Sequence, residues 1–130
     1  MVSGNQPAHV IWEGAQFLAV LNVPPDNPGH SVIITKQHFE SVFALQEPLY
    51  SEFFQAAKSL YAPLKEAVGM EGVAVNFGTV GCGHVHINLI PVNEDDMRHP
   101  HGPIQMDETL LAKIAENIRN RIAANSNGGI

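Results

Sequence analysis

The chain of 130 residues is the size of a single domain with its own hydrophobic core. Its 45% hydrophobic and 15% charged residues are typical of a globular protein and exclude a disordered one. With 7 Lys and Arg against 13 Asp and Glu, the formal net charge is −6, which excludes a basic surface for long nucleic acids. The single cysteine, Cys82, excludes an internal disulfide and a zinc site built from cysteines. No apolar run reaches membrane-spanning length and the first residues do not resemble a signal peptide, so we expect a cytoplasmic protein without a membrane partner.

The first third of the chain predicts three β-strands. Residues 9–13 and 16–22 are rich in strand-forming side chains and flank a two-residue turn of hairpin length. Residues 23–29 contain three prolines, which remove backbone donors, and are therefore expected to form a fixed loop. Residues 30–35 then read as a third strand.

The next segment changes to the spacing of a helix. Glu47-Pro48 suits the start of a helix, and Gly69 suits its end. Between them, apolar residues recur every three to four positions: Leu49, Phe53, Ala56, Ala57, Leu60, Leu64 and Val68. Pro63 is expected to kink this helix or to split off its last turn.

The rest of the chain predicts two more strands and a final helix. The strands span residues 72–77 and 83–91, and residues 93–105 are polar and rich in proline, which favours a loop. Asp107 can cap a helix that frays at its S-N-G-G end. We therefore expect one α+β domain over residues 1–130, with a mostly antiparallel five-stranded sheet, a long helix after the third strand and a C-terminal helix. Its core spans about residues 9–92, and the C-terminal loop and helix span residues 93–124.

The most informative stretch of the chain is the predicted last strand, which reads G-H-V-H-I-N-L-I-P from Gly83. Because side chains alternate between the two faces of a strand, His84, His86 and Asn88 share one face and apolar residues cover the other. Glycines before the strand leave backbone amides able to approach a ligand. We call His84, His86 and Asn88 the polar strip.

Two histidines in this spacing can serve three purposes. They can bind a metal, which needs a third or fourth ligand, usually His, Asp or Glu. The histidines elsewhere in the chain that could complete such a site are His30, His38, His99 and His101. One imidazole can instead be a nucleophile that attacks phosphorus or an acyl carbon. The pair can also be purely structural, and the spacing alone leaves all three open.

Three motifs in order resemble the histidine triad (HIT) family. The first is His84-Val85-His86-Ile87-Asn88-Leu89-Ile90-Pro91, which is similar to the alternating histidines of that family with Asn88 in place of the third histidine. The second runs from Asn22 through Pro28-Gly29-His30 to Lys36-Gln37-His38, and the third is Asn76-Phe77-Gly78. The resemblance covers roughly residues 10–91, and the cysteine pair that binds zinc in some members is absent.

The resemblance implies a HIT-like fold and a role for each matching residue. His86 is expected to attack the α-phosphorus of a nucleotide and form a covalent nucleotidyl-histidine, while His84 and His30 orient and polarise the site. The resemblance places Asn22 at the ribose, Asn76 at the phosphate or leaving group and Phe17 at the base. The chain lacks the Gly-Gln pair that the family has before the last strand, and the residues expected to contact the phosphate in addition are Asn88, Thr79, Cys82 and Gly83.

The expected function is hydrolysis of a nucleoside monophosphate derivative of the dinucleotide or phosphoramidate type, with no obligatory metal or cofactor. Asn88 cannot shuttle a proton, so a catalytically impaired nucleotide-binding protein is one alternative. The other is nucleotidyl transfer by the same intermediate, which is implied by resemblance to the galactose-1-phosphate uridylyltransferases, whose sequences carry an amide near this position. By resemblance the partners are a small nucleotide and a second copy of the chain, in a homodimer that covers a sheet edge.

Overall fold

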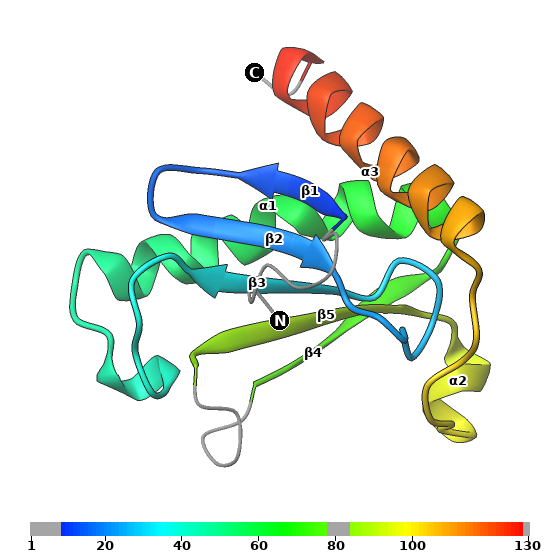
Figure 1. Ribbon diagram of the computed structural model, residues 1–130, viewed down its shortest axis with the longest axis horizontal. Helices are drawn as coiled ribbons and strands as arrows, with labels where there is room; N and C mark the ends of the chain where they lie inside the picture. The colour runs from blue at the N-terminus through cyan, green and yellow to red at the C-terminus, as the bar shows by residue number, and fades with distance from the viewer. Residues whose placement is uncertain (1–8, 78–83, 129–130) are drawn as a thin grey trace.

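The structure is a computed structural model that describes residues 9–77 and 84–128, with side chains as far as Asn125. Within these residues five strands form one sheet in the order β1-β2-β3-β5-β4, and all neighbouring strands are antiparallel. The strands are β1 (Val10–Glu13), β2 (Phe17–Leu21), β3 (Ser31–Thr35), β4 (Gly72–Asn76) and β5 (His86–Val92). Strands β1 and β4 are therefore the two edges of the sheet (Figure 1).

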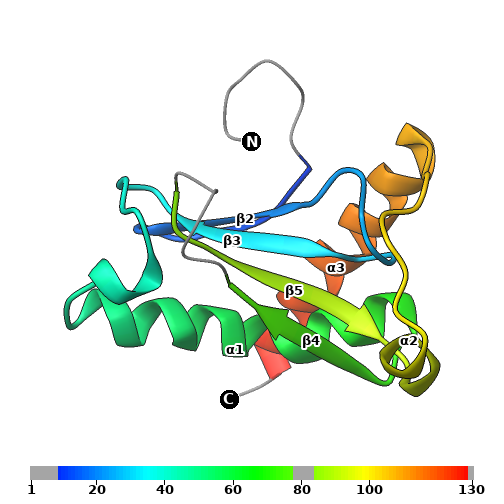
Figure 2. The same ribbon diagram turned by 90° about the horizontal axis from the view of Figure 1, so that it is seen from below.

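Two long helices lie on one side of this sheet. The described helices are the short 3₁₀ helix η1 (Val42–Ala44), α1 (Leu49–Val68), α2 (Glu94–Arg98) and α3 (Glu108–Gly128). Helix α1 runs along one face of the sheet, and α3 packs against α1 and β1 (Figure 2). In the described part of the chain, no helix is both long and apolar enough to cross a membrane.

The hydrophobic core lies between the sheet and these helices. On the central strands, Ile33 and Ile87 point into it and are fully buried. They meet Phe53 and Leu60 from α1 and Ile118 from α3, which are buried to the same degree. Because strand residues alternate, the helix-covered face takes one set of side chains from β3 and β5 and leaves the polar strip on the opposite face.

The α+β prediction is confirmed, and most boundaries fall close to the predicted ones. Helix α1 ends at Gly69, which takes a left-handed conformation with φ of 70°. At its start, Glu47 accepts hydrogen bonds from the Ser51 amide and hydroxyl. Pro63 does not split off the last turn, since α1 is continuous to Val68. The Pro63 ring is fully buried, and we attribute the unbroken helix to this packing, which offsets the lost backbone hydrogen bond.

Two expectations about the C-terminal region are wrong. The predicted loop 93–105 contains helix α2, because Asn93 and Asp96 form a reciprocal capping box around its first turn. The final helix begins as expected, with the Leu110 amide donating to Asp107 over 2.8 Å. It then continues to Gly128 instead of ending at residue 124.

Gly29 and Gly69 provide a matched test of the packing around Gly29, the residue just before His30. Both have positive φ, 88° and 70°, so an alanine at either position costs about 1–2 kcal/mol of conformational strain. Only at Gly29 would the added Cβ approach other atoms closely, 3.0 Å from Pro91 Cγ and 3.2 Å from Val68 Cγ1. We therefore expect Gly29→Ala to lower the free energy of unfolding, measured in urea, more than Gly69→Ala does. Equal losses would contradict this packing.

Candidate functional site

The polar strip lies on the face of the sheet that the helices leave open. Val85, Ile87 and Leu89 are buried at 1%, 0% and 2% exposure, whereas all three residues of the strip are partly exposed. This alternation confirms which side chains share a face. Across the sheet, His86 is opposite Ile34 on β3, and Asn88 lies between Val32 on β3 and Asn76 on β4.

Backbone carbonyls set the tautomers of the two histidines on the strip. The His84 Nε2 atom lies 2.8 Å from the Thr35 carbonyl oxygen, and the His86 Nδ1 atom lies 3.2 Å from the His84 carbonyl oxygen. A carbonyl only accepts hydrogen bonds, so each of these nitrogens carries its proton. In the neutral His86 ring, the lone pair is therefore on Nε2.

A directed chain of hydrogen bonds joins His30 to the strip. The Asp26 amide donates to His30 Nδ1 over 3.0 Å, which places the proton of the neutral ring on Nε2. His30 Nε2 then donates to Asn88 Oδ1 over 2.9 Å, and Asn88 Nδ2 donates to Asn76 Oδ1 over 3.0 Å. The chain fixes the orientation of both amides, with oxygen toward His30 in Asn88 and oxygen toward Asn88 in Asn76.

His30 is held neutral by its surroundings. Burial lowers its pKa below the ordinary value of 6.5, and the hydrogen bond to Asn88 and the charge of Asp26 only partly oppose this. The side chain is 4% exposed. A neutral ring is also what the chain of hydrogen bonds requires, since a doubly protonated ring could not accept from the Asp26 amide.

The other residues that the sequence proposed fall into three groups. Asn22 follows β2 beside His30, since its amide donates to the His30 carbonyl, and its side chain donates to the Pro24 carbonyl. Phe17 is not brought to the strip, because it is buried on the helix side and stacks on Phe53 with ring centroids 5.4 Å apart. The residues Thr79, Cys82 and Gly83 lie outside the described residues.

Of the histidines considered as further metal ligands, His30 and His38 contact residues of the strip, but in the described part of the chain they do not form a metal site there. His38 contacts the His84 ring edge-on at 5.1 Å, and both His30 nitrogens are engaged as described above. His101 lies in the segment after α2 and pairs with Asp96. Over residues 9–77 and 84–128, no three His, Cys, Asp or Glu side chains come together as a metal site would need.

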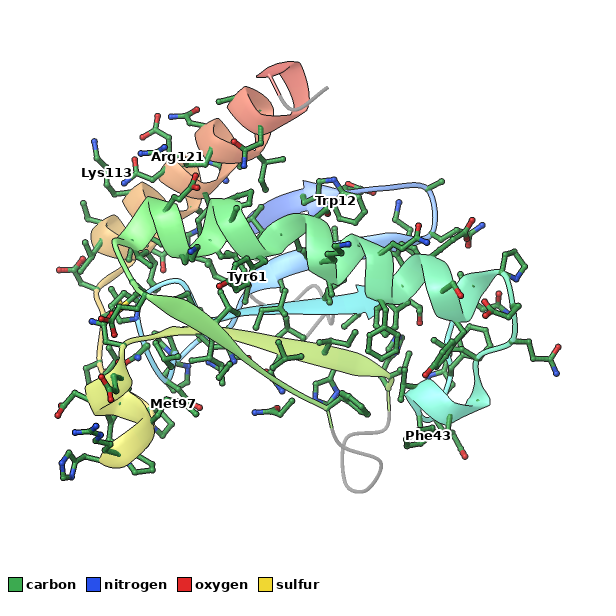
Figure 3. The ribbon with its side chains drawn as sticks, turned by 180° about the vertical axis from the view of Figure 1, so that it is seen from behind. Trp12, Phe43, Tyr61, Met97, Lys113 and Arg121 are labelled. Atoms are coloured by element: carbon green, nitrogen blue, oxygen red, sulfur yellow. The ribbon has the colours of Figure 1, made fainter. Side chains whose placement is uncertain are left out.

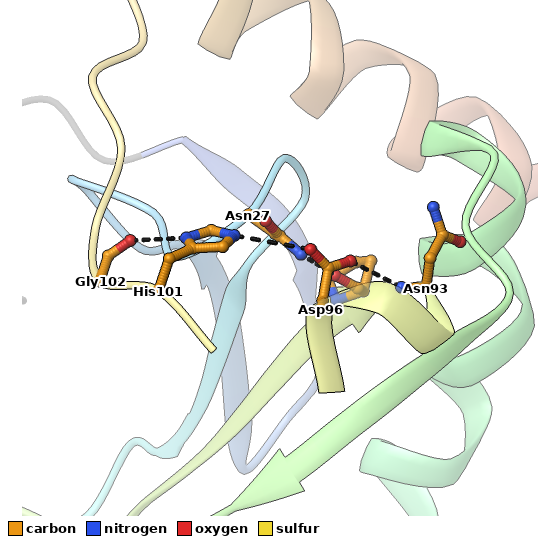
Figure 4. A network of polar contacts seen from close by, with 6 residues as sticks. Asn27, Asn93, Asp96, His101 and Gly102 are labelled. Carbon is orange, nitrogen blue, oxygen red and sulfur yellow. Dashed lines mark hydrogen bonds and ion pairs between the residues drawn. The ribbon is translucent and has the colours of Figure 1, made fainter. Parts of the chain in front are cut away.

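A second polar network supports the loop that holds His30 (Figure 4). The buried Asn27 donates to the Pro91 carbonyl over 3.0 Å and also hydrogen-bonds Asp96, whose carboxylate lies 3.5 Å from His101 Nε2. The Asn93 amide lowers the pKa of Asp96, and the hydrogen bond with the Gly102 carbonyl raises the pKa of His101. These contacts tie the loop to α2 and the segment that follows it.

Sequence reasoning missed the residues that support His30. Asp26 acts through its backbone amide and Asn27 through a contact with Pro91, 64 positions along the chain. A backbone contact leaves no trace in residue type, and so distant a contact leaves none in local spacing. The clustering of prolines around Asp26 and Asn27 was the one signal of a fixed loop.

Comparisons with known proteins identify the family of the chain. The HIT domain family matches residues 3–95. An uncharacterized HIT-like protein from Methanocaldococcus jannaschii is 31% identical over 101 residues, which cover 74% of this chain and 78% of that protein. The adenosine 5′-monophosphoramidase hnt1 from Schizosaccharomyces pombe is 26% identical over 131 residues, with 94% of each chain covered.

Solved structures share the fold at lower identity. A Zn-bound histidine triad family protein from Mycobacterium smegmatis superposes with a TM-score of 0.82 at 19% identity, over 97% of this chain and 91% of that one. A hypothetical histidine triad nucleotide-binding protein from Sulfolobus tokodaii gives a TM-score of 0.81 at 23% identity, over 93% and 87% of the two chains. These structures show the fold, and the family match together with the Methanocaldococcus jannaschii relative shows that the chain belongs to the HIT domain family.

The lowered pKa of His30 predicts a pH dependence of stability. Just below pH 6.5 the unfolded chain binds a proton at this position more readily than the folded chain does. The contribution of His30 is therefore fully present above pH 6.5 and is lost as the pH falls toward the lowered pKa. We expect the free energy of unfolding to fall less between pH 7.5 and pH 5 in His30→Gln than in the wild-type protein. Parallel falls in urea titrations of the two proteins would contradict a buried neutral His30.

Proposed function

We propose that the protein is a nucleotide-binding hydrolase that attacks the α-phosphate of a nucleoside monophosphate derivative through His86. The observation that carries this proposal is the hydrogen bond from His86 Nδ1 to the His84 carbonyl oxygen. It places the lone pair of the neutral ring on Nε2, and the ring is partly exposed on the open face of the sheet. A neutral imidazole with a fixed tautomer is suited to nucleophilic attack on phosphorus.

In this proposal the neighbouring residues position the reactants. His84 holds the His86 ring through its carbonyl, and the Thr35 carbonyl in turn holds His84. His30 orients Asn88, which we propose takes the place of the third histidine of the family, and Asn88 and Asn76 bind phosphate oxygens. Asn22 binds the ribose.

The comparisons support a nucleotide substrate and leave open which acceptor takes the nucleotide from His86. The relative hnt1 is named an adenosine 5′-monophosphoramidase, which favours a nucleoside monophosphate derivative as the substrate of this chain. The intermediate is a nucleotide joined to His86 Nε2. Release to water makes the protein a hydrolase, and release to another acceptor makes it a nucleotidyltransferase. A catalytically impaired nucleotide-binding protein would form no intermediate.

Replacing His86 tests the proposed nucleophile. In His86→Ala we expect turnover of an adenosine monophosphate derivative to fall by about 10³-fold or more, with nucleotide binding by calorimetry largely retained. The control is His99→Ala, an exposed residue beyond α2, which we expect to keep wild-type turnover. Denaturing quench of the wild-type reaction followed by peptide mass spectrometry should find the nucleotide on the peptide containing residue 86. Wild-type turnover in His86→Ala would remove this residue from the mechanism.

The proposed chemistry needs no metal, because the nucleophile and the phosphate-binding donors are all protein groups. Treatment with a chelator should therefore leave turnover unchanged. Loss of turnover that returns on adding back Zn²⁺ would favour a metal-dependent enzyme built on the same face.

We also propose that two copies pair through α1 and the edge strand β4. An apolar groove lies between them, lined by Phe54, Ala57, Lys58, Tyr61, Val73, Val75 and Leu89. Figure 3 shows Tyr61 projecting from α1 on the side of β4, and it is 44% exposed. Val75 on β4 is 55% exposed, and an edge strand has backbone groups available to pair with another strand. A second copy would cover both features at once.

Charge on this surface should separate the two copies. In Val75→Lys we expect the sedimentation mass to drop from two chains to one, because a buried unpaired charge opposes association. Lys113→Glu, an exposed change on α3, is the control and should remain dimeric. A wild-type mass of one chain would end the proposal of a homodimer.

A further inference from the structure

The position after His86 on the polar strip is filled by a carboxamide. Asn88 lies two residues further along β5, on the same face, in register with Asn76 on the neighbouring strand. A carboxamide donates and accepts hydrogen bonds, but it does not give up a proton near neutral pH. The group next to the proposed nucleophile therefore cannot act as an acid.

His30 cannot supply the missing proton through Asn88. Its Nε2 proton is donated to Asn88 Oδ1, and its buried ring is neutral. For a proton to travel on, Asn88 would have to bind it on oxygen and release another from nitrogen, which an amide does not do readily. The hydrogen-bond chain is thus a chain of fixed donors and acceptors and not a proton relay.

The other imidazole protons near the strip are also committed. His84 Nε2 donates to the Thr35 carbonyl, and His86 Nδ1 donates to the His84 carbonyl. His38 contacts His84, which precedes β5 and is four residues, or roughly 13 Å of extended chain, from Asn88. Among residues 9–77 and 84–128, no histidine therefore combines a position beside Asn88 with a proton that it can give away.

The side-chain amides of Asn76 and Asn88 cannot give up a proton, but they can stabilise negative charge. Asn76 is exposed and uses its oxygen to accept from Asn88, so its Nδ2 is the part of this amide that can donate to a ligand. Asn88 Nδ2 has a second N–H beside the one donated to Asn76. N–H donors held in fixed positions stabilise an oxygen on which negative charge develops.

Building on the proposed function, we infer that this site is specific for substrates whose leaving group departs as a stable oxyanion. The phosphate chain of a nucleoside polyphosphate and the carboxylate of an acyl anhydride belong to this class. An amine, as in a phosphoramidate, does not belong to it, because the nitrogen must be protonated before the phosphorus–nitrogen bond breaks. Asn88 is the residue that determines this specificity.

The step balances without an acid. The lone pair of His86 Nε2 forms a bond to phosphorus as the bond from phosphorus to the leaving oxygen breaks, and that oxygen keeps the electron pair. The His86 ring becomes a nucleotidyl-imidazolium and keeps its Nδ1 proton, donated to the His84 carbonyl. Water then attacks phosphorus, the electron pair of the nitrogen–phosphorus bond returns to Nε2, and the proton of the water passes to solvent.

The test compares leaving groups on a single nucleoside monophosphate. The probes are adenosine 5′-phosphoramidate, diadenosine tetraphosphate and a series of aryl esters of adenosine monophosphate with phenols of decreasing acidity. In the wild-type protein we expect kcat/KM to be greatest for the tetraphosphate, to fall steeply along the aryl series and to be at least about 10²-fold lower for the phosphoramidate.

Asn88→His restores an acid at this position, since its ring can accept from His30 and donate from the other nitrogen. We expect the ratio of phosphoramidate to tetraphosphate turnover to rise by about 10²-fold or more and the aryl series to become less steep. Asn120→His, an exposed change on α3, is the matched control and should keep the wild-type ratio.

The outcomes separate this inference from the proposed function. A wild-type protein that cleaves the phosphoramidate as fast as the tetraphosphate, with the nucleotide found on His86, overturns the inference and leaves the proposed function standing. The aryl series measured in the wild-type protein gives a result even if Asn88→His does not fold. If kcat/KM depends only weakly on the acidity of the phenol, the inference is equally overturned. A protein that forms no adduct with any probe overturns both.

Discussion

The hydrogen bond from the His30 ring to the Asn88 oxygen is the contact on which the geometry of the site depends. It orients the Asn88 amide, which orients Asn76, and it requires that His30 be protonated on Nε2. That tautomer is in turn set by the Asp26 amide. The hydrogen bonds therefore run in one direction, from the Asp26 amide through His30 and Asn88 to Asn76. As a result, the amide oxygens are engaged within the chain of hydrogen bonds, and the amide N–H groups are the donors available near His86.

The fold supplies the conditions that this contact needs. Burial keeps His30 neutral, and Gly29 allows the chain to turn tightly against Pro91 and Val68 just before it. On the other side of the loop, Ile104 donates its amide to the Pro25 carbonyl over 2.8 Å. The C-terminal segment therefore helps to hold a histidine that lies far from it in sequence, which gives α2 and the residues after it a role in the site.

The sequence predicted the parts of the site that follow from local periodicity. Alternation along a strand placed His84, His86 and Asn88 on one face, and Gly69 marked the end of α1. Alternation does not reveal which face of each strand the helices cover. The resemblance places Phe17 at the base, but its side chain packs in the core against Phe53. The contact between Asn27 and Pro91 joins distant segments, and local spacing holds no information about it.

The positions of the imidazole protons are the central claim, and nitrogen NMR of the histidine side chains tests them most directly. At pH 8, in protein labelled with ¹⁵N, the account predicts a neutral His30 ring with its proton on Nε2 and a neutral His86 ring with its proton on Nδ1. A doubly protonated His30, or a His86 ring with its proton on Nε2, would contradict the account.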